Sequence, residues 1–159
     1  MEIGAYLGRS TSYIASAVAR RQNVNFYTVD TWQNQGMSEG ERDTYGEFCA
    51  NVQPWKDYIQ TFRGFSWEVV KQWNRPIDLL WIDADHSYVA ARRDVLDWVP
   101  FLKVKGWLCL DDYATAAGIA QVVRDVLLPI CSSRRLVGKM WAARLARPLD
   151  RGGHPALRR

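Results

Sequence analysis

Three carboxylates in this chain stand where they could share a divalent cation. Asp83 comes directly after the apolar run 77–82, and Asp111 and Asp112 come directly after the run 107–110. Both runs are predicted to be buried parallel strands, and ligands of such sheets bind beyond the carboxyl ends of the strands. Carboxylates gathered there repel one another, and a cation relieves the repulsion. Oxygen ligands select Mg²⁺, Mn²⁺ or Ca²⁺ over zinc. The alternative is a pair of solvated, Asp-rich turns that cap helices.

The chain opens on a glycine-containing turn of the kind that brings a backbone close to a ligand. An acidic residue and a β-former precede Gly4 and Gly8, and the hydroxyl residues Ser10 and Thr11 open a helix rich in small residues. The glycines allow a tight turn, and the hydroxyls can cap N–H groups of the helix or hydrogen-bond a ligand. This order predicts the first strand, loop and helix of a nucleotide-binding, Rossmann-like unit. The spacing is not Gly-x-Gly-x-x-Gly, so the dinucleotide fingerprint is absent.

A second strand end suits a nucleoside. Asp30 ends the predicted strand 26–30, about 20 residues beyond Gly8, which is the distance expected for an acid that binds a ribose. One carboxylate can accept hydrogen bonds from both hydroxyls of the diol. An aspartate that only caps its own loop is the alternative.

The elements that position these residues alternate along the chain. The expected strands lie at 1–4, 26–30, 58–63, 77–82, 107–110, 134–138 and 140–146. The expected helices lie at 10–21, 41–52, 66–73, 88–102 and 115–128. This alternation predicts an α/β fold, a Rossmann-like, doubly wound and mostly parallel sheet with an antiparallel C-terminal strand. We expect one domain over residues 1–146 and a loose basic tail over 147–159.

Composition places the chain among globular proteins. It has 159 residues, of which 48% are hydrophobic and 24% charged, with a net charge of +4. Nine of the basic residues and two of the acidic ones fall in 124–159, and a solvated end explains this stretch better than a nucleic-acid surface because it lacks interleaved aromatics. No apolar run reaches membrane-spanning length, and the first residues do not resemble a signal peptide. Three cysteines without metal-ligand spacing predict buried free thiols and a cytoplasmic location.

The opening motif resembles motif I of the class I S-adenosylmethionine-dependent methyltransferases. Within that superfamily, the string from Ile82 to Tyr88 and the Asp-Tyr pair after the next strand resemble the metal-dependent O-methyltransferases of the catechol type and methyltransferase domain family 24. The resemblance covers residues 1–146. It implies that a set of residues contacts S-adenosylmethionine: Glu2, Gly4, Tyr6, Gly8, Ser10, Asp30, Ser66 and Asp83. In this family a Gly-x-Ser after the third strand lies beside the adenine, and here Phe65 at its centre could stack on that ring or belong to the core.

The resemblance also implies roles at the acidic strand ends. It makes Asp83, Asp111 and Asp112 ligands of Mg²⁺, Mn²⁺ or Ca²⁺, with Asp112 in place of the usual Asn. The catechol-type enzymes carry a Lys base three residues beyond the first ligand, where this chain has His86. A neutral imidazole is a suitable base near pH 7, although a lone histidine is more often structural. Asp85 could orient His86, bind metal or cap the next helix.

The activity that this implies is methylation of a hydroxyl on a small molecule, which includes sugars. The family has strand residues and helices before the motif, so the resemblance implies an N-terminally truncated or minimal domain, or a site that another subunit covers. That truncation favours, as an alternative, a relative that binds S-adenosylmethionine without turnover. A nucleic-acid methyltransferase is the other alternative, but the chain has no Asn/Asp-Pro-Pro-Tyr/Phe motif. A homo-oligomer is compatible with the sequence, and a membrane partner is not expected.

Overall fold

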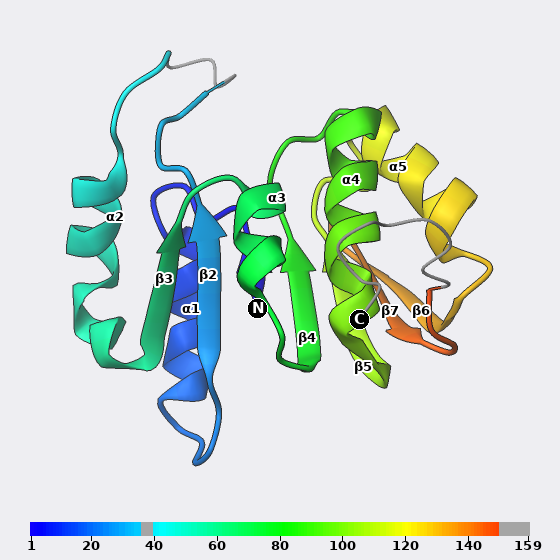
Figure 1. Cartoon of the computed structure of the whole chain (residues 1–159), viewed down its shortest axis with the longest axis horizontal. Helices are drawn as coiled ribbons and strands as arrows, with labels where there is room; N and C mark the ends of the chain where they lie inside the picture. Colours follow the sequence, from blue (N-terminus) through cyan, green and yellow to red (C-terminus); the bar gives the residue numbers. More distant parts are fainter. Residues whose placement is uncertain (36–39, 150–159) are drawn as a thin grey trace. The chain divides into compact units, whose positions relative to one another are not determined.

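The computed structural model describes residues 1–35 and 40–149. The chain divides into two compact units, Met1–Val69 and Val70–Arg159, and each combines strands with helices (Figure 1). In the described residues, no helix has both the length and the apolar character needed to cross a membrane.

The first unit is a parallel three-stranded arrangement with helices. Its strands stand in the order β3-β2-β1, and the registers pair Glu2 with Thr28 and Phe26 with Ile59. Helix α1 packs against β2 (Figure 1). The elements are β1 (Glu2–Ile3), α1 (Arg9–Val18), β2 (Phe26–Asp30), α2 (Tyr45–Val52), the 3₁₀ turn η1 (Gln53–Tyr58), β3 (Ile59–Arg63) and α3 (Ser66–Val69).

An aromatic cluster forms the core between the β1–α1 loop and α2. Trp32 and Phe48 are fully buried, and their ring centroids lie 4.7 Å apart. Gly8 stands against this cluster with a φ of +83°, and a Cβ on it would lie 2.6 Å from Val52 Cγ1. Only glycine satisfies both the left-handed backbone and the close approach.

The second unit contains the mixed part of the fold. Its strand order is β4-β5-β7-β6; β4 and β5 are parallel, and β7 is antiparallel to both of its neighbours. Helices α4 and α5 pack against each other (Figure 1). The elements are η2 (Val70–Gln72), β4 (Ile77–Ile82), α4 (Tyr88–Trp98), η3 (Val99–Phe101), β5 (Leu102–Leu110), α5 (Ala117–Val122), the π-helical turn η4 (Val123–Leu127), β6 (Cys131–Val137) and β7 (Met140–Leu145).

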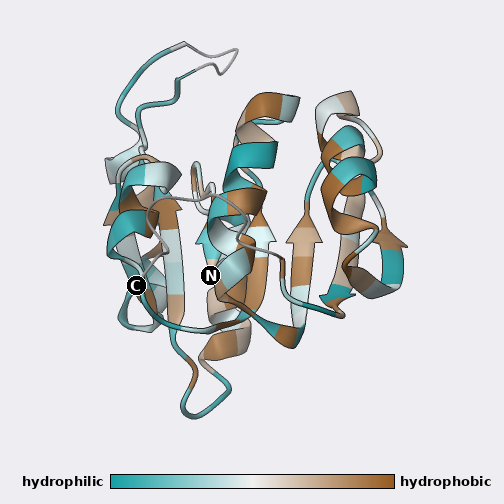
Figure 2. Cartoon of the chain, turned by 45° about the vertical axis from the view of Figure 1, so that its right-hand side comes forward, coloured by the Kyte–Doolittle hydropathy of each residue, from teal (hydrophilic) through white to brown (hydrophobic). Residues whose placement is uncertain are grey.

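Helix α4 is amphipathic, as its sequence predicts. Ala91, Val95 and Trp98 recur at helical spacing and are fully buried, whereas Val89 is exposed. Figure 2 shows the same division, with hydrophilic and hydrophobic residues on different sides of the helices and hydrophobic residues along most strands.

The predicted α/β class and its antiparallel C-terminal strand are confirmed, and strands 26–30 and 77–82 have the predicted bounds. The boundaries differ elsewhere for local reasons. The helix predicted over 88–102 ends at Trp98, where Pro100 follows, and β5 starts at Leu102 instead of Trp107.

Other predicted segments are shorter, and two burial predictions fail. The helix predicted at 41–52 begins at Tyr45, and that predicted at 66–73 is helical only to Val69. Cys49 is exposed, unlike Cys109 and Cys131, although all three thiols are free as predicted. The run 77–82 is not continuously buried, since Leu79 is 41% exposed. The predicted tail lies, from residue 150 on, outside the described residues.

Candidate functional site

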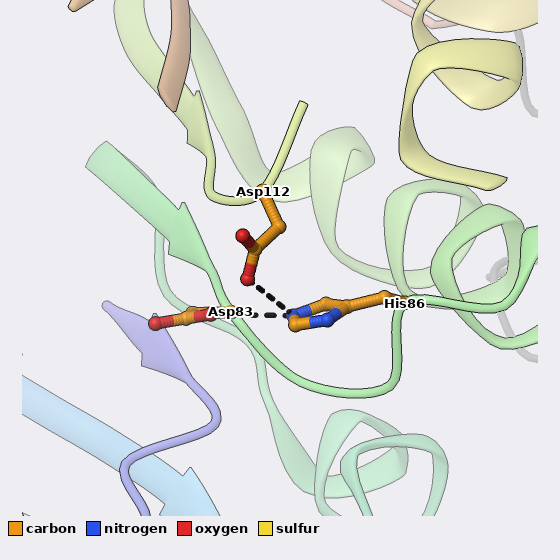
Figure 3. Close-up of side chains that lie close together, drawn as sticks. All are labelled: Asp83, His86 and Asp112. Carbon is orange, nitrogen blue, oxygen red and sulfur yellow. Dashed lines mark ion pairs between the residues drawn. The ribbon is translucent and has the colours of Figure 1, made fainter. Parts of the chain in front are cut away.

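The carboxyl ends of β4 and β5 bring two carboxylates and an imidazole together. Asp83 and His86 follow β4, Asp112 follows β5, and the three side chains point toward one another (Figure 3). His86 Nε2 lies 3.5 Å from Asp83 Oδ1 and 3.4 Å from Asp112 Oδ2. The three ligand atoms lie within 4.8 Å of one another. Of the sequence-predicted residues, the structure therefore gathers Asp83, His86 and Asp112.

The turn after β5 holds Asp112 in an unusual backbone conformation. The Asp111 amide donates to the Ile82 carbonyl at 3.1 Å, which ties this turn to the end of β4. Asp112 then has a φ of +55°, in the left-handed region where Asn and Asp are enriched among residues other than glycine. The Ala116 amide donates to the Asp112 carbonyl at 2.7 Å. The left-handed backbone thus suits an aspartate at position 112.

The loop that carries His86 is fixed from two directions. Asp85 Oδ1 accepts the Ser87 amide at 2.7 Å, and the Ser87 hydroxyl caps α4 by accepting the Ala90 amide at 3.3 Å. Of the roles open to Asp85, the structure shows the one at the helix start. From α5, a Cβ on Gly118 would lie 2.4 Å from the His86 carbonyl oxygen and 2.5 Å from the Tyr88 nitrogen. The missing side chain of Gly118 therefore allows the start of α5 to pack closely against the backbone of residues 86–88.

The electrostatics of the cluster favour a charged His86 imidazole and a charged Asp112 carboxylate. The contact with Asp83 raises the pKa of His86, burial opposes this, and the nearby Asp112 charge adds to the increase. Burial raises the pKa of Asp112, but Thr115, Lys139 and His86 outweigh that effect and lower it. The Thr115 hydroxyl donates to Asp112 Oδ1 at 2.6 Å. A carboxylate at position 112 is thus stabilised in its ionised form.

Asp111 lies outside this three-residue group. Its Oδ2 contacts Lys139 Nζ at 2.9 Å, and the same ammonium lies 3.0 Å from Asp112 Oδ1. Lys139 sits in the β6–β7 hairpin, 27 residues beyond Asp112, and sequence reasoning missed it. No local pattern marks this lysine, because it reaches the acids only through the β5–β7 pairing.

The donor set fits a divalent cation. Oxygens of Asp83 and Asp112 lie close enough together for one ion to contact both, and the imidazole nitrogen of His86 lies beside them. His86 Nε2 is buried and has no hydrogen-bond partner among the described residues, although it faces both carboxylates. A set dominated by carboxylate oxygens suits Mg²⁺ or Mn²⁺.

In the first unit, Asp30 organises the opening loop. Its Oδ2 accepts the Ala5 amide at 2.7 Å and the Tyr6 amide at 2.8 Å, and its Oδ1 accepts the Trp32 amide at 2.8 Å. Tyr6 has a φ of +46°, and its carbonyl accepts the Trp32 indole N–H at 3.0 Å. Asp30 is therefore a loop anchor in this structure. An ionised carboxylate accepts about four hydrogen bonds, so one acceptor position remains for a ligand hydroxyl.

Glu2 has a similar anchoring role beneath the loop. The Ser10 hydroxyl donates to its Oε1 at 2.7 Å, and the Thr11 hydroxyl donates to its Oε2 at 2.6 Å. Glu2 is fully buried, and this burial raises the pKa of its carboxyl. The expectation that these hydroxyls cap α1 is corrected: Gly8 is the N-cap, without a side-chain cap, and both hydroxyls donate to Glu2. A contact of Ser10 with a ligand stays a prediction. Glu2 thus fixes the start of α1 from within, and its contact with S-adenosylmethionine stays a prediction.

Gly4 and Ser66, two further predicted cofactor residues, are partly buried in the first unit. Gly4 has a φ of +88° and its amide donates to the Val29 carbonyl at 2.9 Å, which ends β1. Ser66 opens α3 after Gly64 and is partly buried. Next to it, Phe65 and Trp67 stack with ring centroids 4.2 Å apart.

Comparison with known proteins identifies the class. The family model of the methyltransferase domain, family 24, matches residues 1–113. The chain therefore belongs to this methyltransferase family.

Solved structures share the fold at low sequence identity. The O-methyltransferase NovP is similar at a TM-score of 0.74 and 13% identity, over 92% of this chain and 71% of NovP. Apo CalS11, a TDP-rhamnose 3'-O-methyltransferase of calicheamicin biosynthesis, gives a TM-score of 0.67 at 17% identity, over 91% of this chain and 70% of CalS11. MycE of the mycinamycin pathway, in complex with Mg and SAH, gives 0.60 at 17% identity, over 97% of this chain and 46% of MycE. The fold is that of the class I S-adenosylmethionine-dependent O-methyltransferases.

Proposed function

We propose that this protein transfers a methyl group from S-adenosylmethionine to a hydroxyl of a small molecule with the help of a divalent cation. The observation that carries the proposal is the convergence of Asp83, His86 and Asp112 at the ends of two parallel strands. A cation at two carboxylates beside a histidine is the arrangement that hydroxyl activation needs.

The first unit supplies the cofactor residues in this proposal. S-adenosylmethionine provides an electrophilic methyl group on a sulfonium. Asp30 holds the opening loop by three backbone amides and keeps one acceptor position for a ribose hydroxyl. Gly4 and Gly8 turn the loop, and Ser66 at the start of α3 would lie beside the adenine.

The second unit supplies the acceptor chemistry. Asp83 and Asp112 would hold the cation. Asp111 remains a predicted ligand, and its ion pair with Lys139 would have to break before it could bind the cation. A divalent cation held there would lower the pKa of the acceptor hydroxyl. His86 Nε2 would receive the hydroxyl proton, because it is the nitrogen that faces the two carboxylates. The same carboxylates stabilise the imidazolium that forms.

A sugar is the acceptor class we favour. CalS11, which shares the fold, is a TDP-rhamnose 3'-O-methyltransferase, and the MycE complex contains Mg and SAH. Both observations concern those proteins, and they direct the choice of candidate substrates here. Nucleotide-linked deoxysugars are therefore the first compounds to test.

The test combines cofactor binding with methyl transfer. Calorimetric titration with S-adenosylmethionine should give binding, and methyl transfer to nucleotide-linked sugars should require Mg²⁺ and stop with a chelator. Asp83→Asn should abolish the Mg²⁺-dependent turnover. Asp78→Asn is the matched control, because Asp78 lies on β4 but pairs with Lys103 at the surface. Turnover that persists in chelator and in Asp83→Asn would rule out the metal-dependent mechanism.

A further inference from the structure

Lys139 places one positive charge against two neighbouring aspartates. Its Nζ lies 2.9 Å from Asp111 Oδ2 and 3.0 Å from Asp112 Oδ1. The two aspartates are largely buried, with side chains 13% and 18% exposed, whereas the lysine side chain is 53% exposed. The ammonium thus covers the acid pair from the solvent side.

The backbone of this lysine is fixed by the hairpin that carries it. Val137 pairs with Met140, so Gly138 and Lys139 form a two-residue turn, and Gly138 has a φ of +59°. The Ala114 amide donates to the Lys139 carbonyl at 3.1 Å, which binds the turn to the segment after β5. The hairpin therefore fixes the backbone of Lys139 beside the acid pair, and only the Lys139 side chain would have to move to release the carboxylates.

Asp112 is shared between two cationic groups. Its Oδ2 faces His86 Nε2 at 3.4 Å, and its Oδ1 faces Lys139 Nζ at 3.0 Å. A divalent cation that uses an oxygen of Asp112, with or without Asp111, has to approach a carboxylate already neutralised by Lys139. Two like charges at such short range repel strongly, so the lysine and the cation compete for the same oxygens.

We propose that Lys139 is a built-in counter-ion of the Asp111–Asp112 pair that competes with the divalent cation and sets its affinity. The proposal rests on the cation site of the proposed function. An asparagine at position 112 would remove one charge of the pair; this chain keeps two carboxylates and balances them with a lysine delivered by the β6–β7 hairpin. Lys139 is a positioning residue in this scheme, because it acts on the carboxylates and not on the acceptor.

The experiment is a titration of the metal-free protein with Mn²⁺, followed by calorimetry and by electron paramagnetic resonance of the free ion. Lys139→Met should bind Mn²⁺ about tenfold more tightly than wild type, because two half-exposed ion pairs no longer compete. Lys139→Arg, which keeps the charge, should bind with wild-type affinity. Lys103→Met is the control, since Lys103 on β5 forms an exposed ion pair with Asp78 on β4 of the same unit.

Thermal unfolding separates this role from a merely structural one. Without metal, Lys139→Met should melt at a lower temperature than wild type, because Asp111 and Asp112 then repel one another. Saturating Mn²⁺ should raise its melting temperature by more than it raises that of wild type. If Lys139→Met is too unstable for titration, Lys139→Gln replaces it in both assays.

The outcomes distinguish this inference from the proposed function. Equal or weaker Mn²⁺ binding by Lys139→Met, with wild type binding normally, overturns the counter-ion role and leaves the cation site intact. No Mn²⁺ binding by wild type or by any variant overturns the cation site and the counter-ion role together. Binding by Lys139→Met alone supports both.

Discussion

Removing the Asp30 carboxylate should destabilise the first unit, because this side chain holds three backbone amides of the opening loop. The amides of Ala5, Tyr6 and Trp32 donate to it at 2.7, 2.8 and 2.8 Å. In Asp30→Ala each amide loses a charged acceptor. A hydrogen bond to a charged group contributes about 1.5–3 kcal/mol, and water replaces part of it at a half-buried site. We therefore expect a loss of about 2–4 kcal/mol in the free energy of unfolding.

Asp30→Asn gives a graded test of the same geometry. Its carbonyl oxygen can still accept the Ala5 and Tyr6 amides, but its NH₂ group would face the Trp32 amide, so one donor meets another donor. We expect a loss of about 1–2 kcal/mol, between that of wild type and that of Asp30→Ala. Asp57→Ala, at an exposed position in the same unit, is the control and should stay within about 0.5 kcal/mol.

Urea unfolding followed by tryptophan fluorescence measures these differences, since Trp32 is fully buried against the loop. Titration with S-adenosylmethionine should also show weaker binding by both variants, by about 1–3 kcal/mol for Asp30→Ala. Unchanged stability of Asp30→Ala would refute the anchoring role. Weakened cofactor binding at unchanged stability would then assign Asp30 to the ribose alone.

Three further predictions concern the second unit. His86→Gln should lower turnover by about 10²–10⁴ with nearly unchanged cofactor affinity, and the lower limb of the pH–rate profile should disappear; full activity on the true acceptor would make His86 structural. Because the folded-state pKa of His86 lies above its ordinary value, its charged form stabilises the metal-free protein at pH below about 6.5, and this contribution is lost as the pH rises through the folded-state value. The difference in melting temperature between wild type and His86→Gln should thus be larger at acidic than at alkaline pH, and a constant difference would contradict the assignment. Gly118→Ala should destabilise the protein by about 1–3 kcal/mol and weaken Mn²⁺ binding, because the new Cβ meets the backbone of His86 and Tyr88 at 2.4 and 2.5 Å. Gly46→Ala in α2, with no atom within 4 Å of the new Cβ, should instead raise stability by about 0.5–1 kcal/mol in the same urea unfolding assay.

Local sequence predicts the elements of this protein well where β-forming residues follow one another. The runs 26–30 and 77–82 form strands with the predicted bounds, because a short run of apolar β-formers favours a strand over a helix or a loop. Asp83 and Asp112 could be placed at neighbouring strand ends for the same reason: consecutive parallel strands end at the same edge of a sheet. Boundaries set by local competition, such as the end of α4 before Pro100, were predicted less well.

The sequence by itself therefore determined the fold class, the motif and the residue types available for a cation and a cofactor. Only the tertiary structure decided which partners those residues take. Asp30 bonds amides 24 and 25 residues away, and Lys139 reaches Asp111 and Asp112 through the pairing of β5 with β7. The physical reason is that a carboxylate accepts from whichever donor the strand registers and turns bring within about 3 Å. That proximity is a property of the folded backbone, and no single stretch of sequence encodes it.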